Sequence, residues 1–142
     1  MHKSYDTVLT YGTFDLFHVG HLRLLARLSR LGRRVIVACS TDEFNLAKGK
    51  VTGIPFAQRV EILEGCRYVD KVIPETNWDQ KVRDVQEFGV DLFAMGDDWA
   101  GAFDFLGELC DVLYLPRTEN ISTTELKALI QTMRQSGMRA AG

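Results

Sequence analysis

The sequence lacks the features that mark several specialised classes of protein. Its three cysteines, Cys39, Cys66 and Cys110, are odd in number and far apart. Disulfide frameworks and cysteine metal sites need paired or closely spaced cysteines, so we expect these three to be buried small apolar side chains. The net charge is −2, so the chain also lacks the excess of basic residues with which proteins displace counterions from nucleic-acid phosphates. We therefore expect no nucleic-acid partner.

Long apolar runs are missing as well, since the longest are the length of a β-strand. The first six residues do not contain the apolar segment and small-residue cleavage site of a signal peptide. We therefore expect a cytoplasmic protein that does not bind a membrane. Its 142 residues and 46% hydrophobic content predict one domain over residues 1–142, with a flexible tail after about residue 137.

Short apolar runs alternate with segments of helical periodicity along the chain. The runs predict strands at residues 7–11, 34–39, 69–73, 91–95 and 112–115. The periodic segments predict helices at residues 19–31, 55–66 and 78–88, with a last helix from about residue 122. This order predicts a single α/β domain with a Rossmann-like, doubly wound parallel sheet, in which ligands bind beyond the carboxyl ends of the strands.

Two segments carry more specific expectations. Periodicity is lost over residues 41–55, and glycines beside Lys48 and Lys50 predict a mobile loop there, of which residues 48–53 are expected to act as a lid. In the last helix, apolar residues at helical spacing predict a buried face made of Leu126, Leu129, Ile130 and Met133.

The strand-to-helix turn that follows the first strand predicts a phosphate site. Gly12 allows a tight turn, and the helix that begins near His18 directs its first backbone amides beyond the sheet. His18 and His21 lie one helical turn apart on the same face, with Gly20 between them, so both imidazoles can donate hydrogen bonds to one phosphate chain. Two alternatives remain open at this point: a metal site that uses both rings, and two incidental histidines.

A second candidate anion site follows the last strand. Ser122 and Glu125 have the spacing of a helix capping box, which needs no function, while the same hydroxyl and free amides also suit a phosphate. Arg117, just upstream, favours the anion site. Asp97 and Asp98 follow the fourth predicted strand, where they fit a turn, a metal ligand or an acceptor for a ligand hydroxyl.

The two motifs together resemble the two signatures of the HxGH cytidylyltransferase family. Residues 12–15 and 18–21 match the first signature. Arg117 and residues 121–124 match the second, written RTxGISTT, in which Asn120 stands where the family has Gly. Asn tolerates a positive φ better than most residues, so we expect the turn to survive. The resemblance extends through residues 40–45, 67–70, 77–78 and 95–99 and covers nearly the whole chain.

The resemblance implies a reaction in which CTP and sn-glycerol 3-phosphate give CDP-glycerol and pyrophosphate. It also implies Mg²⁺ that accompanies CTP, a homodimer, and a product used for a polymer such as teichoic acid or a capsule. Related folds act on other pairs, such as CTP with phosphoethanolamine or phosphocholine, and ATP with flavin mononucleotide. These pairs remain alternatives, as do a non-catalytic nucleotide-binding module and a metal-dependent hydrolase.

The resemblance also selects site residues. Taken singly, the basic residues outside the two motifs are typical of solvated surface; they are Lys48, Lys50, Arg59, Arg67 and Lys81. By resemblance, the catalytic residues are His18, His21, Lys48 and Arg117. The nucleotide-binding residues are Thr13, Phe14, His18, His21, Arg67, Asp98, Arg117, Ile121, Ser122, Thr123 and Thr124. The acceptor-binding residues are Asp15, Lys48, Lys50 and Lys81, and no side chain is expected to form a metal site of its own.

Overall fold

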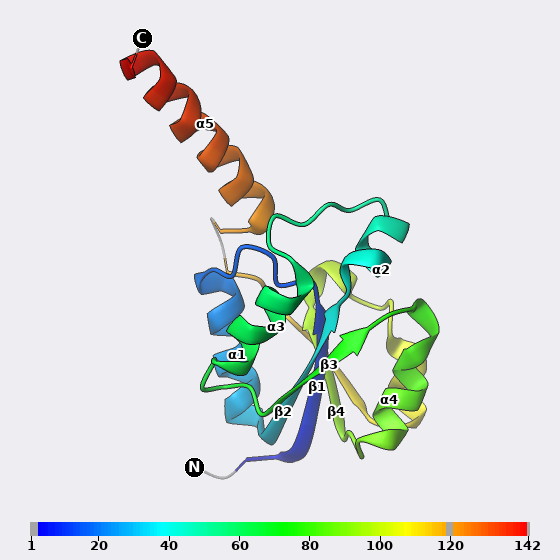
Figure 1. Cartoon of the computed structure of the whole chain (residues 1–142). Helices are drawn as coiled ribbons and strands as arrows, with labels where there is room; N and C mark the ends of the chain where they lie inside the picture. The colour runs from blue at the N-terminus through cyan, green and yellow to red at the C-terminus, as the bar shows by residue number, and fades with distance from the viewer. Residues whose placement is uncertain (1–2, 119–120, 142) are drawn as a thin grey trace.

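The computed structural model describes residues 3–118 and 121–141, so Asn120 lies outside the described residues. The centre of this part of the chain is a five-stranded parallel sheet in the order β3-β2-β1-β4-β5 (Figure 1). The strands are β1 (Tyr5–Gly12), β2 (Gly32–Ser40), β3 (Lys71–Glu75), β4 (Leu92–Gly96) and β5 (Asp111–Leu115). The parallel order confirms the expected Rossmann-like, doubly wound fold.

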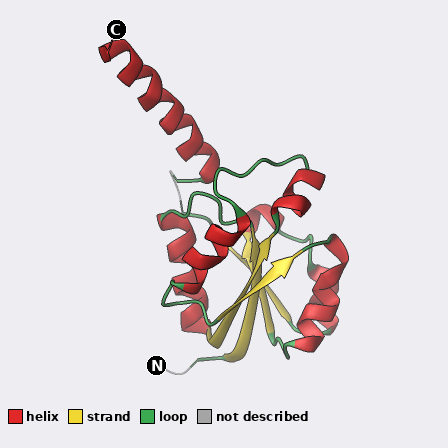
Figure 2. Cartoon of the chain, in the orientation of Figure 1, coloured by secondary structure: helices red, strands yellow, loops and turns green. Residues whose placement is uncertain are grey.

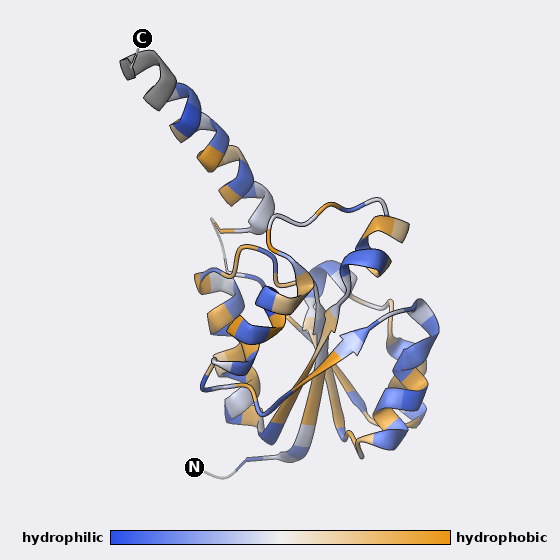
Figure 3. Ribbon diagram, in the orientation of Figure 1, coloured by the Kyte–Doolittle hydropathy of each residue, from blue (hydrophilic) through white to orange (hydrophobic). Residues whose placement is uncertain are grey.

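Helical segments cover both faces of the sheet (Figure 2). The helices are α1 (Val19–Leu31), α2 (Asp42–Ala47), α3 (Phe56–Glu64), α4 (Lys81–Glu87) and α5 (Thr123–Ala141). Short 3-10 segments are η1 (Trp78–Gln80), η2 (Asp97–Trp99) and η3 (Asp104–Glu108). In β1, Val8 packs with α1 and α3, whereas Leu9 packs with α4 and η3 on the opposite face. This alternation gives the sheet an apolar core on each side, and the central strands are mostly hydrophobic in Figure 3.

The order of the strands reverses after β3. Strands β1, β2 and β3 follow one another toward one edge of the sheet, whereas β4 returns to the other side of β1 and β5 continues outward. At such a reversal the loops that follow neighbouring strands separate, which leaves a crevice beyond their carboxyl ends. Here the crevice lies beyond Gly12 of β1 and Gly96 of β4, where the sequence predicts the ligand.

The segment over residues 41–55 is only partly a loop. Its first part forms α2, because Thr41 accepts a hydrogen bond from the Phe44 amide and the Phe44 ring is buried. A helix of six residues is too short to show a recognisable apolar period in the sequence. The loop prediction was therefore wrong for residues 42–47, while residues 48–55 do form an irregular connection.

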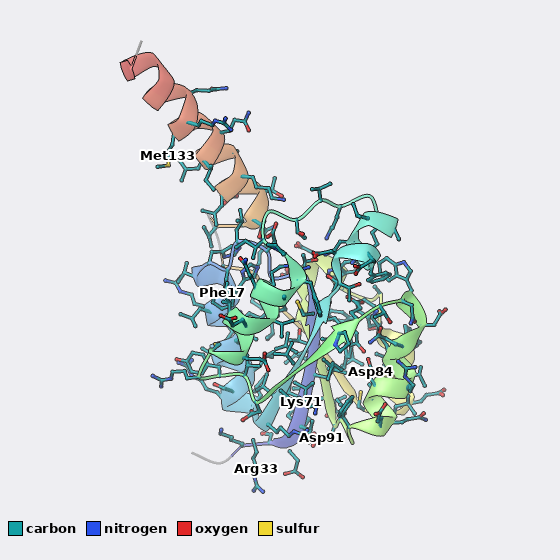
Figure 4. All side chains as sticks on the ribbon, viewed as in Figure 1. Phe17, Arg33, Lys71, Asp84, Asp91 and Met133 are labelled. Carbon is teal, nitrogen blue, oxygen red and sulfur yellow. The ribbon has the colours of Figure 1, made fainter. Side chains whose placement is uncertain are left out.

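The last helix also differs from its prediction. Helix α5 projects away from the domain in Figure 1, and Met133 lies far from the sheet in Figure 4. Leu129, Ile130 and Met133 are 53%, 52% and 63% exposed, so the prediction that they are buried was wrong; Leu126 is half-buried. Helical periodicity predicts an apolar face but does not say what covers it. The helix continues to Ala141, and flexibility after residue 137 stays a prediction.

The prediction that the cysteines are buried is confirmed for Cys39 and only in part for Cys66 and Cys110. All three are free; Cys39 is buried, and Cys66 and Cys110 are half-buried. Cys39 and Cys66 belong to the core beneath α1 and α3, and Cys110 belongs to the core on the other face. None of the described helices is both long and apolar enough to cross a membrane.

Candidate active site

The turn between β1 and α1 has an unusual backbone. Phe14 and Leu16 have positive φ angles of 54° and 50°, in a region that residues with side chains seldom adopt. Gly12 makes room for this path, because a Cβ at its position would lie 2.7 Å from the Phe14 ring. The Thr123 hydroxyl of α5 donates a hydrogen bond of 2.9 Å to the Asp15 carbonyl oxygen. Such conformations persist where their surroundings hold them, and they concentrate at functional sites.

His18 and His21 form a capping box at the start of α1. His18 Nδ1 accepts a hydrogen bond from the Gly20 amide at 3.0 Å, and His21 Nδ1 accepts one from the His18 amide at 3.2 Å. A neutral imidazole that accepts at Nδ1 carries its proton on Nε2. The two rings are stacked, with their centroids 3.8 Å apart. The helix cap therefore assigns one tautomer to both rings and leaves two Nε2–H groups as donors.

Both histidines are mainly neutral near pH 7. Burial, followed by the charge of His18, lowers the pKa of His21 to about 4. Burial, followed by the nearby Arg117 guanidinium, lowers the pKa of His18 below its usual value. Preorganised neutral donors stabilise negative charge on a phosphoryl oxygen without delivering a proton, as the donors of an oxyanion hole do.

A cavity of about 220 Å³ opens beside the histidines. We call it the arginine cavity; its lining includes His18, His21, Arg27, Asp98, Arg117, Ile121, Ser122 and Thr123. Arg117 Nη1 lies 3.6 Å from the Asp98 carboxylate, and both side chains are largely exposed. Exposed ion pairs contribute little free energy, so an incoming phosphate can take over the Arg117 guanidinium at small cost.

A larger cavity of about 440 Å³ adjoins the first. We call it the lysine cavity; its lining includes Thr13, Phe14, Asp15, Lys48, Lys50, Trp78, Lys81, Thr124 and Lys127. His21 and Thr123 line both cavities. A group bound in the arginine cavity can therefore meet a group bound in the lysine cavity beside the His21 ring.

The lysines of this cavity differ in their environments. Lys48 is half-buried, its Nζ lies 4.3 Å from the centroid of the Phe44 ring, and burial lowers its pKa. Lys81 is 3% exposed, and its Nζ lies 3.3 Å from the Glu75 carboxylate. Lys50 is exposed. The interpretation of these lysines as solvated surface was thus wrong for Lys81, which the fold buries against a counter-charge.

Asp15 joins three segments of the site. Its buried carboxylate accepts hydrogen bonds from the Gly53 and Ile54 amides at 2.8 and 3.0 Å, and Lys127 Nζ lies 3.5 Å away. Burial alone would raise the pKa of Asp15, but the two amides and Lys127 outweigh burial and lower the pKa. Lys127 Nζ also donates to the Val51 carbonyl oxygen at 3.2 Å. The carboxylate therefore ties the turn after β1 to the loop after α2 and to α5.

Arg59 is buried, against the expectation of a surface residue. It is 1% exposed, and its guanidinium donates at 2.8 Å to the carbonyl oxygens of Thr13 and Ser40. It also donates to the Asp42 carboxylate at 2.8 Å. The signal that could have found it is spacing, because Arg59 precedes the buried Leu63 by one turn on α3. Arg59 fixes the ends of β1 and β2 beneath the site.

The structure brings together nearly all the residues that the resemblance selects. His18, Asp98, Arg117, Ile121 and Ser122 line the arginine cavity, His21 and Thr123 line both cavities, and Thr13, Phe14, Asp15, Lys48, Lys50, Lys81 and Thr124 line the lysine cavity. Arg67 is different, because it is exposed and lines neither cavity in the described part of the chain. Its contact with CTP stays a prediction. The lining also includes Tyr11, Glu75, Phe103 and Lys127, which neither sequence motif indicates.

Paired histidines at a helix start, beyond the first strand of a Rossmann-like sheet, are the arrangement of a nucleotidylyltransferase. More specifically, the chain belongs to the cytidylyltransferase-like family, whose model matches residues 9–129. The glycerol-3-phosphate cytidylyltransferase of Bacillus subtilis (strain 168) is 58% identical over 120 residues, which cover 84% of this chain and 93% of that protein. The glycerol-3-phosphate cytidylyltransferase of Staphylococcus aureus (strain NCTC 8325 / PS 47) is 56% identical, with coverage of 84% and 91%.

A solved structure shares the fold. The lipopolysaccharide core biosynthesis protein from Thermoplasma volcanium GSS1 superposes with a TM-score of 0.68. The match covers 80% of this chain and 98% of that chain at 20% sequence identity. At this identity the likeness shows a common architecture.

Proposed function

We propose that the protein transfers CMP from CTP to sn-glycerol 3-phosphate and forms CDP-glycerol and pyrophosphate. The observation that carries the proposal is the junction of the two cavities at His21 and Thr123. CTP in the arginine cavity and the acceptor in the lysine cavity would meet beside the two Nε2–H donors. The 58% identity to the Bacillus subtilis glycerol-3-phosphate cytidylyltransferase supports this acceptor.

The proposed reaction needs alignment and charge neutralisation and no covalent intermediate. An oxygen of the acceptor phosphate attacks the α-phosphorus of CTP and forms the new P–O bond. The bond from the α-phosphorus to the oxygen that bridges to the β-phosphorus breaks, and pyrophosphate leaves with that electron pair. His18 and His21 donate hydrogen bonds to phosphoryl oxygens as negative charge grows. Arg117 and the Ser122 hydroxyl hold the departing pyrophosphate.

The lysine cavity supports a negatively charged acceptor. Lys48, Lys50 and Lys127 bring ammonium groups to its lining. A phosphate monoester carries between one and two negative charges near pH 7, so these groups attract and orient it. The half-buried ammonium of Lys48 is the one that we expect to contact the acceptor phosphate most closely.

Mg²⁺ is proposed to enter with the triphosphate of CTP. Residues 3–118 and 121–141 contain no group of three or more His, Cys, Asp or Glu that could hold a metal ion. The side chains of the described residues therefore fit an ion whose ligands are mainly phosphate oxygens and water, with at most one protein carboxylate. Asp98 of the arginine cavity is the carboxylate that would share it. When bound there, the ion neutralises charge on phosphate oxygens.

We also propose a homodimer, a cytoplasmic location and a biosynthetic use for the product. The exposed side chains of Leu129, Ile130 and Met133 on α5 support contact between two copies, because large apolar groups are costly to leave in water. The cytoplasm is the compartment that supplies CTP. CDP-glycerol is an activated donor of glycerol phosphate, suited to building a polymer such as teichoic acid or a capsule.

Pyrophosphate release tests the proposed function. The purified protein is incubated with Mg²⁺ and each pairing of CTP or ATP with glycerol 3-phosphate, phosphoethanolamine, phosphocholine or flavin mononucleotide. The proposal predicts that CTP with glycerol 3-phosphate exceeds every other pair by about 10²-fold or more in kcat/KM. Activity with ATP and flavin mononucleotide but none with CTP would contradict it. Nucleotide binding without release from any pair would point to the non-catalytic module.

A further inference from the structure

Lys81 lies in a cage of three aromatic rings and one carboxylate. Its Nζ is 4.6 Å from the centroid of the Tyr11 ring, 5.3 Å from that of Phe103 and 5.4 Å from that of Trp78. The Glu75 carboxylate lies 3.3 Å from the same nitrogen, and the Lys81 side chain is 4% exposed. We call Tyr11, Glu75, Trp78 and Phe103 the Lys81 cage. All four residues line the lysine cavity, where the acceptor is proposed to bind.

The walls of the cage are held by contacts that do not involve Lys81. The Tyr11 hydroxyl donates a hydrogen bond to the buried Asp84 carboxylate. The Phe103 amide donates a hydrogen bond of 2.8 Å to the Tyr114 hydroxyl. The carboxylate of the cage belongs to the last residue of β3, which is paired with β2 in the sheet. The cage is therefore expected to persist when the lysine is shortened.

The chemistry of the cage is that of an ammonium site. Aromatic faces attract alkylammonium groups such as choline through the ring quadrupole, and a nearby carboxylate adds a counter-charge. In this protein the ammonium group of Lys81 takes the place that such a ligand would occupy. An acceptor with its own ammonium group would find the cage filled and would meet a like charge, which strongly disfavours binding. A polyol phosphate carries no such group.

We propose that Lys81 determines the class of acceptor by filling the aromatic cage, which excludes amino-alcohol phosphates and reserves the lysine cavity for polyol phosphates. This inference rests on the proposed function, because it concerns the acceptor of the same reaction. It differs from the role that the family resemblance implies, contact with the acceptor phosphate, because that contact would serve all phosphorylated acceptors alike. The ion pair with Glu75 favours the new role, since it already balances the Lys81 charge.

Replacement of Lys81 tests the inference through selectivity. In Lys81→Ala the rings and Glu75 face an open space, so kcat/KM with phosphocholine and phosphoethanolamine is expected to rise. The ratio of kcat/KM with glycerol 3-phosphate to kcat/KM with phosphocholine is expected to fall by about 10²-fold or more. The double variant Lys81→Ala/Glu75→Gln keeps the space without the counter-charge and is expected to lose most of the gain.

Lys81→Met is the matched control. Its side chain has a similar length and no charge, so it keeps the cage filled and should gain no activity with phosphocholine. Thermal unfolding and CTP binding report whether each variant is folded. If Lys81→Ala loses activity with both acceptors by the same factor, or if Lys81→Met gains as much as Lys81→Ala, the inference is wrong.

A measurement on the unmodified protein keeps the test independent of folding. Phosphocholine, well above the KM of glycerol 3-phosphate, is expected not to compete with that acceptor. Competition would overturn the inference without any variant. An unmodified protein that does not use glycerol 3-phosphate would refute the proposed function, whereas activity with an unchanged selectivity ratio in Lys81→Ala would refute this inference alone.

Discussion

The rings of His18 and His21 are stacked with their centroids 3.8 Å apart, and Nδ1 of each ring accepts a backbone amide at the start of α1. One local structure therefore serves two purposes. Capping satisfies amides that a helix start leaves without partners, and the same hydrogen bonds leave Nε2–H free for a phosphate. Because both pKa values are lowered, the rings can remain in contact near pH 7 without charge repulsion.

Replacing His18 by Asn separates capping from catalysis. Asn is a good N-cap residue, but its short amide does not reach the position of the imidazole Nε2. We expect kcat to fall by about 10²-fold or more while the free energy of unfolding changes by less than about 1 kcal/mol. Steady-state kinetics and urea unfolding measure the two effects. Arg23→Ala, at an exposed position of α1, is the control and should change neither. Normal turnover by His18→Asn would refute the donor role.

Acid should destabilise the fold through His21. The pKa of His21 is about 4 in the folded protein, whereas the ordinary value of 6.5 applies in the unfolded chain. The unfolded chain therefore binds more protons between these two pH values. The free energy of unfolding should therefore fall as the pH drops from about 6.5 to about 4, by at most roughly 3 kcal/mol from this residue. Above that range His21 adds no pH dependence. Urea unfolding of the unmodified protein and of His21→Phe measures the effect, and equal slopes in the two proteins would rule out this origin.

Asp15→Asn should loosen the loop after α2. The amide side chain loses the charge that attracts Lys127 and accepts hydrogen bonds from Gly53 and Ile54 less strongly, which should cost about 1–3 kcal/mol of stability. Hydrogen exchange at the Gly53 and Ile54 amides should become faster, and the KM for the acceptor should rise more than the KM for CTP. Asp79→Asn, at an exposed position, is the control. Unchanged exchange at both amides would show that Asp15 does not hold the loop.

The proposed homodimer can be tested on α5. Leu129→Glu places a charge on the exposed apolar face, whereas Gln131→Glu places the same charge on the same helix about half a turn away from that face. Sedimentation velocity should show a dimer for the unmodified protein and for Gln131→Glu, and monomers for Leu129→Glu. A monomeric unmodified protein would refute the homodimer. A dimer that survives Leu129→Glu would show that the contact uses another surface.

The sheet and the two anion-binding turns could be predicted from sequence because their signals are local. Val8 and Leu9 both face apolar layers, so β1 has the continuous apolar run of a central parallel strand. His18 and His21 lie one turn apart on a helix whose start follows a strand. Each of these signals lies within a window of about ten residues, where spacing determines which side chains share a face.

The rest of the site depends on contacts between distant segments. Tyr11 and Lys81 meet only because β1 and α4 pack on the same face of the sheet, and neither residue has a local motif. The sequence predicts Arg59 at the surface. In the structure Arg59 is buried, because carbonyl oxygens at the ends of β1 and β2 accept hydrogen bonds from its guanidinium. The opposite error occurred at Leu129, where an apolar period predicts burial although no described segment covers the helix.

Isotope labelling tests the central claim, transfer of CMP to an oxygen of the acceptor phosphate. Glycerol 3-phosphate with ¹⁸O in its phosphate is incubated with the protein, CTP and Mg²⁺, and the products are analysed by mass spectrometry. The proposed mechanism predicts that CDP-glycerol retains all of the label, including the oxygen that bridges its two phosphorus atoms, and that pyrophosphate has none. Label in pyrophosphate, or release of pyrophosphate without CDP-glycerol, would contradict it.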